Sequence, residues 1–153
     1  MSGKILVPHD GYEMSEKALK YAIEIAKAMR MEIIILRVVS PVISDTTLYS
    51  FLSDKERRRV RRELTHVDKQ VQSKIYDNLA KQLTACMSKN VKASRLVVIG
   101  DPVEKILSVT QKENPYLIVI GSRRLKGLGK LKVLGSVAMK VSENARCPVV
   151  IVH

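Results

Sequence analysis

Three short segments carry residue types whose spacing favours binding of a phosphate-bearing ligand. His9-Asp10 directly follows an apolar run that ends at Pro8, and Val38 to Pro41 follows a second apolar run. The third segment, Gly121 to Ser136, combines glycines with basic residues and leads into a helix-like pattern. Backbone amides at a helix N-terminus carry partial positive charge and can hold phosphate, which glycine lets approach closely. The competing interpretation of the third segment is a flexible loop whose serine only caps a helix.

The chain is strongly basic, with a formal net charge of +12. The charge is concentrated in the run from Arg57 to Arg62 and in five basic residues between Gly121 and Gly135, with no acid among them. Such a balance attracts nucleic acid, free nucleotides and anionic membranes alike. No helix-turn-helix, zinc or aromatic platform accompanies the charge, so nucleic acid is not the favoured partner. A solvated helix start or a surface facing another protein explains the Arg57 to Arg62 run.

Groups that could support turnover chemistry are few. His9 beside Asp10 could carry a proton, but no serine or cysteine nucleophile is spaced to join it, so we expect His9 to be structural or to line a ligand site. Cys86 and Cys147 form no metal-ligand spacing and are typical of reduced thiols in a cytoplasmic chain. The sequence therefore predicts no catalytic residue and no metal site formed by protein side chains alone.

The elements that position these segments follow from hydrophobic periodicity. The expected strands are Lys4–Pro8, Ile33–Val39, Leu96–Ile99, Leu117–Ile120 and Cys147–Val152. The expected helices are Ser15–Met31, Asp54–Ser88, one from Val103 to before Pro115, and Val137–Asn144. Ser15 and Asp54 are the residue types that begin helices as N-caps. Short apolar strands alternating with helices predict one α/β domain over residues 1–153, with an open, doubly wound, five-stranded parallel sheet and helices on both faces.

Two further expectations follow from the same patterns. The long helix from Asp54 to Ser88 has a single apolar stripe, which we expect to pack on the sheet rather than form a coiled-coil seam. No apolar run approaches the roughly 20 residues that a membrane helix needs, and the start of the chain has no signal-peptide pattern. A cytoplasmic protein without a membrane partner is therefore expected.

A series of motifs, in order along the chain, resembles the universal stress protein family. The motifs are Lys4-Ile5-Leu6-Val7-Pro8 with Asp10, Val98-Ile99-Gly100-Asp101-Pro102, Leu117-Ile118-Val119-Ile120-Gly121-Ser122-Arg123, Leu134-Gly135-Ser136-Val137-Ala138 and Cys147-Pro148-Val149-Val150-Ile151-Val152. The resemblance covers nearly the whole chain and is weakest from Ser40 to Ser88. It implies the strand order 3-2-1-4-5, an adenine nucleotide α-hydrolase-like fold, and a regulatory or stress-response protein. The implied ligand is ATP or another adenine nucleotide, with or without Mg²⁺.

The resemblance also implies the residues of the site. In ATP-binding members the signature is G-x-x-G, nine residues, then G-[ST]; Gly121, Gly135 and Ser136 match it in kind. Asp10 matches the acidic position near the nucleotide, and Val38 the position whose backbone meets the adenine. The full implied nucleotide-binding set is Pro8, His9, Asp10, Val38, Ile120, Gly121, Arg123, Arg124, Gly135, Ser136 and Val137.

Arg124 departs from the family pattern, because it stands at the position of the second glycine. The interval from Gly121 to Gly135 is also one residue longer than in the pattern. Either the guanidinium of Arg124 takes over part of the phosphate recognition, or it fills the phosphate site and blocks the nucleotide. In the second case the chain acts through protein contacts by way of its basic loop.

Two enzymatic hypotheses stay open beside nucleotide binding and action through protein contacts. One is an enzyme that holds a phosphorylated small molecule with Arg123, Arg124 and Lys126. The other is slow ATP hydrolysis, which would require Asp10 to help hold a metal–nucleotide complex.

The last strand predicts self-association. Pro148 to Val152 (Pro148, Val149, Val150, Ile151 and Val152) is mostly apolar, and the family's strand order places it on a sheet edge. An exposed apolar edge strand pairs readily with other chains unless it is covered. Antiparallel pairing with a symmetry mate would satisfy its backbone groups, so a homodimer through this strand is expected. The identity of any other protein partner does not follow from the sequence.

Overall fold

The computed structural model describes residues 3–39, 53–122, 125–126, 132–133 and 135–153. The strands are β1 (Lys4–Pro8), β2 (Glu32–Val39), β3 (Ala93–Ile99), β4 (Leu117–Gly121), β5 (Leu125–Lys126), β6 (Lys132–Val133) and β7 (Val149–Val152). The helices are α1 (Glu13–Met29), α3 (Asp54–Ser88), α4 (Pro102–Glu113) and α5 (Ser136–Asn144).

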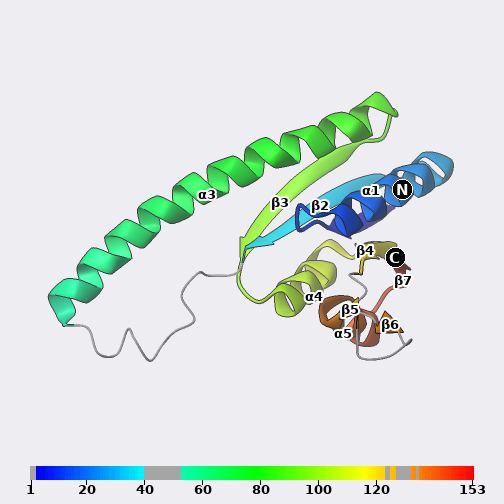
Figure 1. The fold of residues 1–153 in the computed structure, drawn as a ribbon. Coiled ribbons are helices and arrows are strands. Elements are labelled where there is room, and N and C mark those ends of the chain that lie inside the picture. Colours follow the sequence, from blue (N-terminus) through cyan, green and yellow to red (C-terminus); the bar gives the residue numbers. More distant parts are fainter. Residues whose placement is uncertain (1–2, 40–52, 123–124, 127–131, 134) are drawn as a thin grey trace.

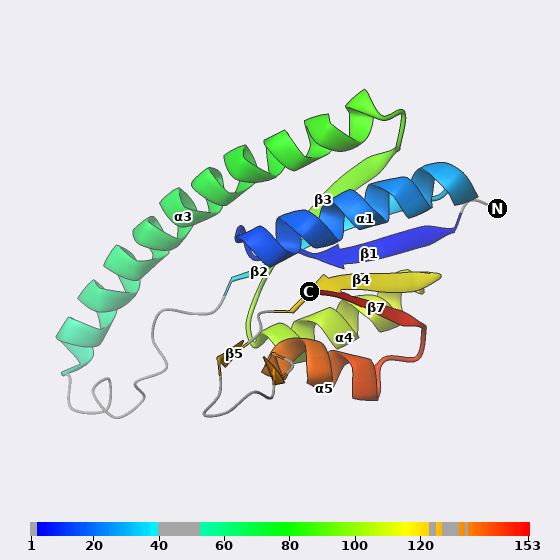
Figure 2. The same cartoon turned by 45° about the vertical axis from the view of Figure 1, so that its right-hand side comes forward.

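Five strands form one parallel sheet in the order β3-β2-β1-β4-β7, which confirms the predicted order and the doubly wound fold class. Helices α1 and α3 cover one face of this sheet, and α4 and α5 cover the other (Figures 1 and 2). The strand order leaves β3 and β7 at the two edges. Among the described residues, no helix is long and apolar enough to cross a membrane.

The core consists of two apolar layers, because successive residues of a strand face opposite sides of the sheet. Ile5 and Val7 of β1 pack beneath α1 and α3, whereas Leu6 between them packs beneath α4 and α5. The same alternation continues past the end of β1. It directs the His9 ring toward the α1 and α3 face, where it meets Glu16.

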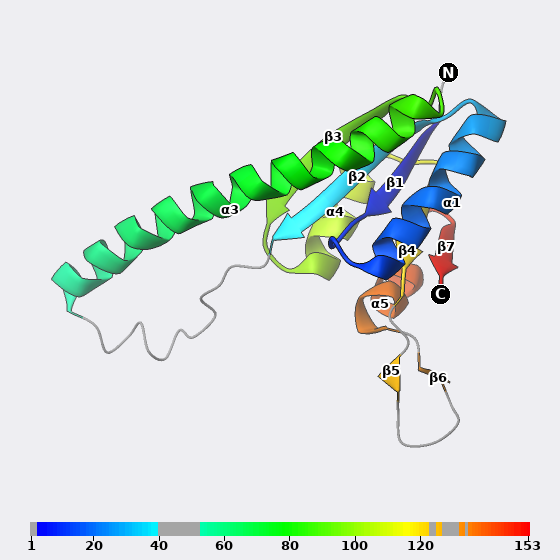
Figure 3. The ribbon, with the colours of Figure 1, turned by 45° about the horizontal axis from the view of Figure 1, so that its top comes forward.

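Helix α3 is much longer than the strands it covers. Its 35 residues span about 52 Å at 1.5 Å per residue. Among the side chains that the structure describes in this helix, the buried Leu79 and Cys86 belong to the core and lie in its C-terminal part, which confirms the predicted use of the apolar stripe there. The N-terminal part extends beyond the sheet (Figures 1 and 3). Ser53, not the predicted Asp54, is the N-cap, and it forms a reciprocal capping box with Glu56.

Other element boundaries differ from those predicted. Helix α1 begins at Glu13, with Tyr12 as its N-cap, so the prediction of Ser15 as N-cap was wrong. Ser15 lies buried in the first turn, where its hydroxyl donates to Asp10 Oδ1 and the Tyr12 carbonyl instead of capping the helix. Strand β3 begins three residues earlier than predicted and β7 two residues later. The short antiparallel pair β5–β6 was not predicted at all. It lies beyond α5 and points away from the five-stranded sheet (Figure 3).

Candidate functional site

A pocket of about 190 Å³ opens at the carboxyl ends of the strands, which is where parallel sheets bind their ligands. We call it the carboxyl-edge pocket. It is lined by Pro8, His9, Asp10, Leu36, Val38, Pro102, Ile106, Ile120, Gly121 and Val137. Strand ends therefore supply most of its wall, and α4 and α5 supply the rest. The wall is largely apolar, which suits a flat organic ring better than an ion.

Asp10 brings a negative charge to the edge of the pocket. It lies in the turn between β1 and α1, which Gly11 completes with a φ of 86°. One carboxylate oxygen, Oδ1, accepts the N–H of Tyr12 at 2.9 Å and the hydroxyl of Ser15 at 2.8 Å. These bonds fix the orientation of the carboxylate while Asp10 remains exposed to solvent.

His9 is almost completely buried, with 3% of its surface exposed. Its Nδ1 accepts the N–H of Gly11 at 3.1 Å. Burial lowers the pKa of His9 below its ordinary value of 6.5, although the charges of Glu16 and Asp10 oppose this shift. The polar contacts of the ring lie on the face covered by α1 and α3, so His9 borders the pocket without directing its ring nitrogens into it.

Gly121 is needed for packing. A Cβ at this position would collide with the backbone carbonyl of Met14 in the first turn of α1, so only glycine lets β4 lie so close to α1. The next residue, Ser122, is buried, and its hydroxyl accepts the N–H of Gly135 at 2.9 Å. This bond ties the end of β4 to the start of α5. It thereby places the first turn of α5 beside the pocket wall at Val137.

The structure brings most of the implied nucleotide-binding residues together. Pro8, His9, Asp10, Val38, Ile120, Gly121 and Val137 line the carboxyl-edge pocket. Gly135 and Ser136 adjoin it as the N-cap and first residue of α5. Arg123 and Arg124 lie outside the described residues.

Sequence reasoning missed three wall residues, Leu36, Pro102 and Ile106. Leu36 could have been found, because it precedes Val38 by two positions and so shares its face of the strand. Pro102 and Ile106 come from α4, whose approach to the pocket depends on how the helix docks on the sheet, and the sequence carries no local signal for it.

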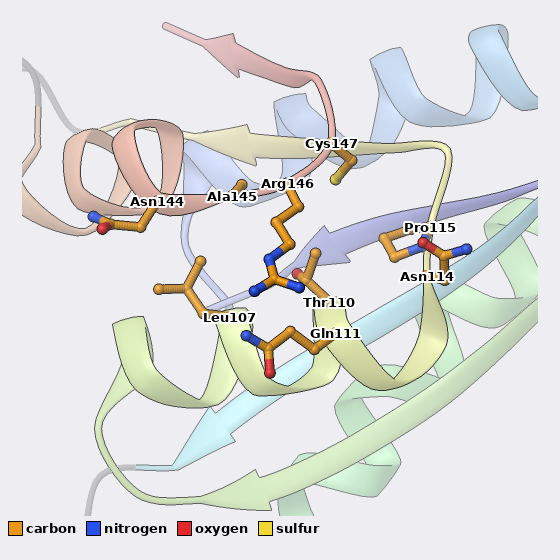
Figure 4. A pocket seen from close by; sticks show the side chains of 9 residues that line it. All are labelled: Leu107, Thr110, Gln111, Asn114, Pro115, Asn144, Ala145, Arg146 and Cys147. Carbon is orange, nitrogen blue, oxygen red and sulfur yellow. The ribbon is translucent and has the colours of Figure 1, made fainter.

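A second, larger pocket of about 430 Å³ lies at the opposite edge of the sheet, between the C-terminal ends of α4 and α5 (Figure 4). We call it the amino-edge pocket. The Arg146 side chain extends into it toward Thr110 and Gln111, and Cys147 borders it (Figure 4). Helix C-termini carry partial negative charge, and Arg146 itself is exposed, so this arrangement is less suited to hold a phosphate than the start of α5.

A protein-bound metal finds little support in the described part of the chain, where no group of three or more histidine, cysteine or acidic side chains could hold one. A cation at the carboxyl-edge pocket would therefore need ligand phosphates for most of its coordination. Asp10 is the acidic side chain in the pocket wall.

Comparisons with known proteins point to one family. The model of the universal stress protein family matches residues 1–153. Universal stress protein YxiE of Bacillus subtilis is 36% identical over the full length of both chains. A universal stress protein solved in complex with cAMP is 22% identical with a TM-score of 0.70, covering 99% of this chain and 97% of its own. One from Archaeoglobus fulgidus in complex with dAMP is 15% identical with a TM-score of 0.65, covering 100% and 98%.

Proposed function

Because this chain belongs to the universal stress protein family, we propose that it is a regulatory protein that binds ATP or another adenine nucleotide in the carboxyl-edge pocket. One observation carries the proposal. Residues from β1, β2, β4 and α5, far apart in the sequence, converge on a single apolar pocket beside a helix N-terminus. Two structural neighbours are complexes with cAMP and dAMP, which supports an adenine nucleotide over other phosphorylated compounds.

Each part of the pocket suits one part of the nucleotide. The apolar wall, which includes Val38 and Ile106, takes the adenine. The carboxylate of Asp10 accepts hydrogen bonds from ribose hydroxyls. The first turn of α5, from Gly135 and Ser136, takes phosphate with its backbone amides.

The size of the pocket limits what it encloses. Its volume of about 190 Å³ is below the ~300–1,000 Å³ typical of ligand pockets, so it would enclose only part of the nucleotide, and the phosphates would extend outward. Arg123 and Arg124 would bind these phosphates in addition to α5. Mg²⁺ would be held by the phosphates, with Asp10 nearby.

Mass spectrometry of small molecules released from freshly purified protein tests the proposal. Calorimetric titration with ATP, AMP and GTP then measures preference for base and phosphate number. We expect an adenine nucleotide in the released fraction and tighter binding of ATP than of AMP or GTP. Protein that carries no nucleotide and shows no binding to any of the three would refute the proposal. If Arg124→Gly then binds ATP, Arg124 fills the phosphate site, and action through protein contacts becomes the better hypothesis.

We further propose that the regulatory unit is a homodimer formed through β7. This strand lies at the edge of the sheet, and Val150 in its middle is 38% exposed. Antiparallel pairing of two copies of β7 would bury these side chains and satisfy the free backbone groups. Light scattering after size exclusion should give a dimer for wild type and a monomer for Val150→Lys. A wild-type monomer at micromolar concentration would contradict the proposal.

A further inference from the structure

The two helices that meet at the amino-edge pocket end in the same way. In an α-helix the carbonyl of one residue accepts the N–H of the residue four positions on. Gln111 of α4 and Asn144 of α5 both line the pocket, and four positions after them stand Pro115 and Pro148. Proline has no backbone N–H, so neither carbonyl can have its helical partner. Each helix therefore ends at the pocket with an unpaired carbonyl.

Helical hydrogen bonding stops just before these two carbonyls. Asn114 donates its N–H to the Thr110 carbonyl at 3.0 Å, and Ala145 donates to the Val141 carbonyl at 2.9 Å. In the part of the chain that the structure describes, no other backbone N–H takes the place of the missing donors. Unpaired carbonyls give a helix C-terminus its partial negative charge, which favours cations and N–H donors. The pocket therefore has two ends that suit a positively charged group.

Arg146 brings the opposite charge. Its side chain extends into the pocket toward Thr110 and Gln111 (Figure 4). Within the described ranges its guanidinium has no ion pair and no hydrogen bond to protein, and no acidic residue lines the pocket. Glu113, at the end of α4, is paired with Lys4 at 2.9 Å instead. A guanidinium binds a carboxylate through two parallel hydrogen bonds, so Arg146 suits a carboxylate from outside the chain.

The rest of the pocket suits an apolar group. Leu107, Ala145 and Cys147 line it and are half-buried, and Pro115 is buried. The volume of about 430 Å³ lies within the ~300–1,000 Å³ typical of pockets for small organic ligands. The pocket therefore combines an apolar base with an arginine and two helix C-termini.

We propose that the amino-edge pocket binds a free α-amino acid with an apolar side chain. The carboxylate binds the guanidinium of Arg146, and the ammonium group donates to the unpaired carbonyls of Gln111 and Asn144. The apolar side chain covers the base of the pocket. A simple anion satisfies the arginine but is repelled by the helix ends, and a simple amine satisfies the helix ends but is repelled by the arginine. The site does not rest on the proposed nucleotide function.

Calorimetric titration of the full chain with three compounds tests the ligand class. The compounds are L-leucine, isocaproate, which is leucine without its ammonium group, and isoamylamine, which is leucine without its carboxylate. We expect saturable binding of leucine and at least about tenfold weaker binding of both analogues, because each lacks charged hydrogen bonds. The absence of leucine binding up to ~10 mM, or an analogue that binds as tightly as leucine, would overturn the proposal.

A matched pair of variants tests the place of binding. Arg146→Gln removes the guanidinium at an exposed position and should weaken leucine binding about tenfold or more. Lys140→Gln removes the same charge from an exposed position of α5 outside the pocket lining and should leave the affinity unchanged. Wild-type affinity in Arg146→Gln, or an equal loss in both variants, would overturn the assignment.

The thiol of Cys147 gives a second readout, because this residue borders the pocket. Saturating leucine should slow the alkylation of Cys147 in the wild-type protein. An unchanged alkylation rate would place leucine elsewhere on the protein and overturn the assignment. Both readouts can be taken without any nucleotide, so their outcome is separate from that of the proposed function.

Discussion

The two pockets at opposite edges of the sheet differ in how they are built. The carboxyl-edge pocket is the smaller, and its wall consists mainly of strand ends that the sheet ladder holds in place. The amino-edge pocket has more than twice the volume, but helix ends and exposed side chains such as Arg146 and Asn144 form it. Volume is therefore a poor guide to the site in this fold. Rigid walls and converging backbone groups are better guides.

The largest effect should be on stability, and it should differ between a glycine at the carboxyl edge of the sheet and one at the amino edge. In Gly121→Ala the new Cβ would meet the rigid backbone of α1, so the free energy of unfolding should fall by about 3 kcal/mol. In Gly3→Ala at the amino edge, the nearest atom is the flexible end of Met31, 3.2 Å away, and the change should stay within about 0.5 kcal/mol. Urea denaturation of both variants measures the difference. Similar losses would mean that the carboxyl edge is no more rigid than the amino edge.

The second-largest effect should be on nucleotide affinity, which we expect to change for variants of the carboxyl-edge pocket and not for variants of the amino-edge pocket. Asp10→Ala should weaken adenine nucleotide binding by about tenfold or more in calorimetry, because a charged hydrogen-bond acceptor is lost. Arg146→Ala in the amino-edge pocket should leave the affinity unchanged. Asp10→Asn retains an acceptor for the N–H of Tyr12 and isolates the contribution of the charge. If Asp10 only holds its turn, Asp10→Ala should lower stability by about 1 kcal/mol without changing the affinity.

The two cysteines should differ in reactivity, since Cys147 borders the amino-edge pocket and Cys86 is buried between α3 and the sheet. Burial raises the pKa of Cys86 from 9.0 to about 11, which reduces its thiolate about a hundredfold. Burial also raises the pKa of Cys147, which remains partly exposed. Alkylation followed by mass spectrometry should label Cys147 first and Cys86 only after denaturant is added. Equal labelling rates in the native protein would contradict this order.

The smallest effect should be a dependence of stability on pH at the carboxyl edge. Burial lowers the pKa of native His9 below 6.5, so the unfolded chain binds more protons than the native one just below pH 6.5. Stability should therefore decrease as the pH falls from 6.5, and His9→Gln should reduce that slope. His153→Gln, at the exposed end of the chain, should leave it unchanged. Denaturation at a series of pH values compares the three proteins.

Much of the fold could be predicted from the sequence because its elements are long and periodic. Runs such as Ile33–Val39 are β-branched and too short for a helix, which favours buried strands, and they indicate the sheet once the helices between them are recognised. The pair β5–β6 was missed because two-residue strands have no periodicity to detect. Ser15 was misplaced because its hydroxyl bonds to Asp10 rather than to a helix amide, and nothing local reveals that choice.

The site was less predictable than the fold. Residues at strand ends, such as Pro8 and Ile120, were assigned through the family resemblance, and the topology of the sheet brings such strand ends to one edge. The role of Gly121 in packing against Met14 depends on the docking of α1. The packing of α3 depends on which of its residues reach the sheet, and the periodic stripe of that helix does not distinguish the part that buries Leu79 and Cys86 from the part that extends beyond the sheet.

The overhang of α3 implies that a single helix contains two regimes of local stability. Its C-terminal part can open only when the core beneath Leu79 and Cys86 separates, whereas its N-terminal part is stabilised by local interactions such as the Ser53–Glu56 capping box. Helical segments without tertiary contacts are marginally stable in water. Amide hydrogens should therefore exchange fastest near Asp54 and progressively more slowly toward Ser88. The helix would then unwind from its N-terminal end while the turns that hold Leu79 and Cys86 remain folded.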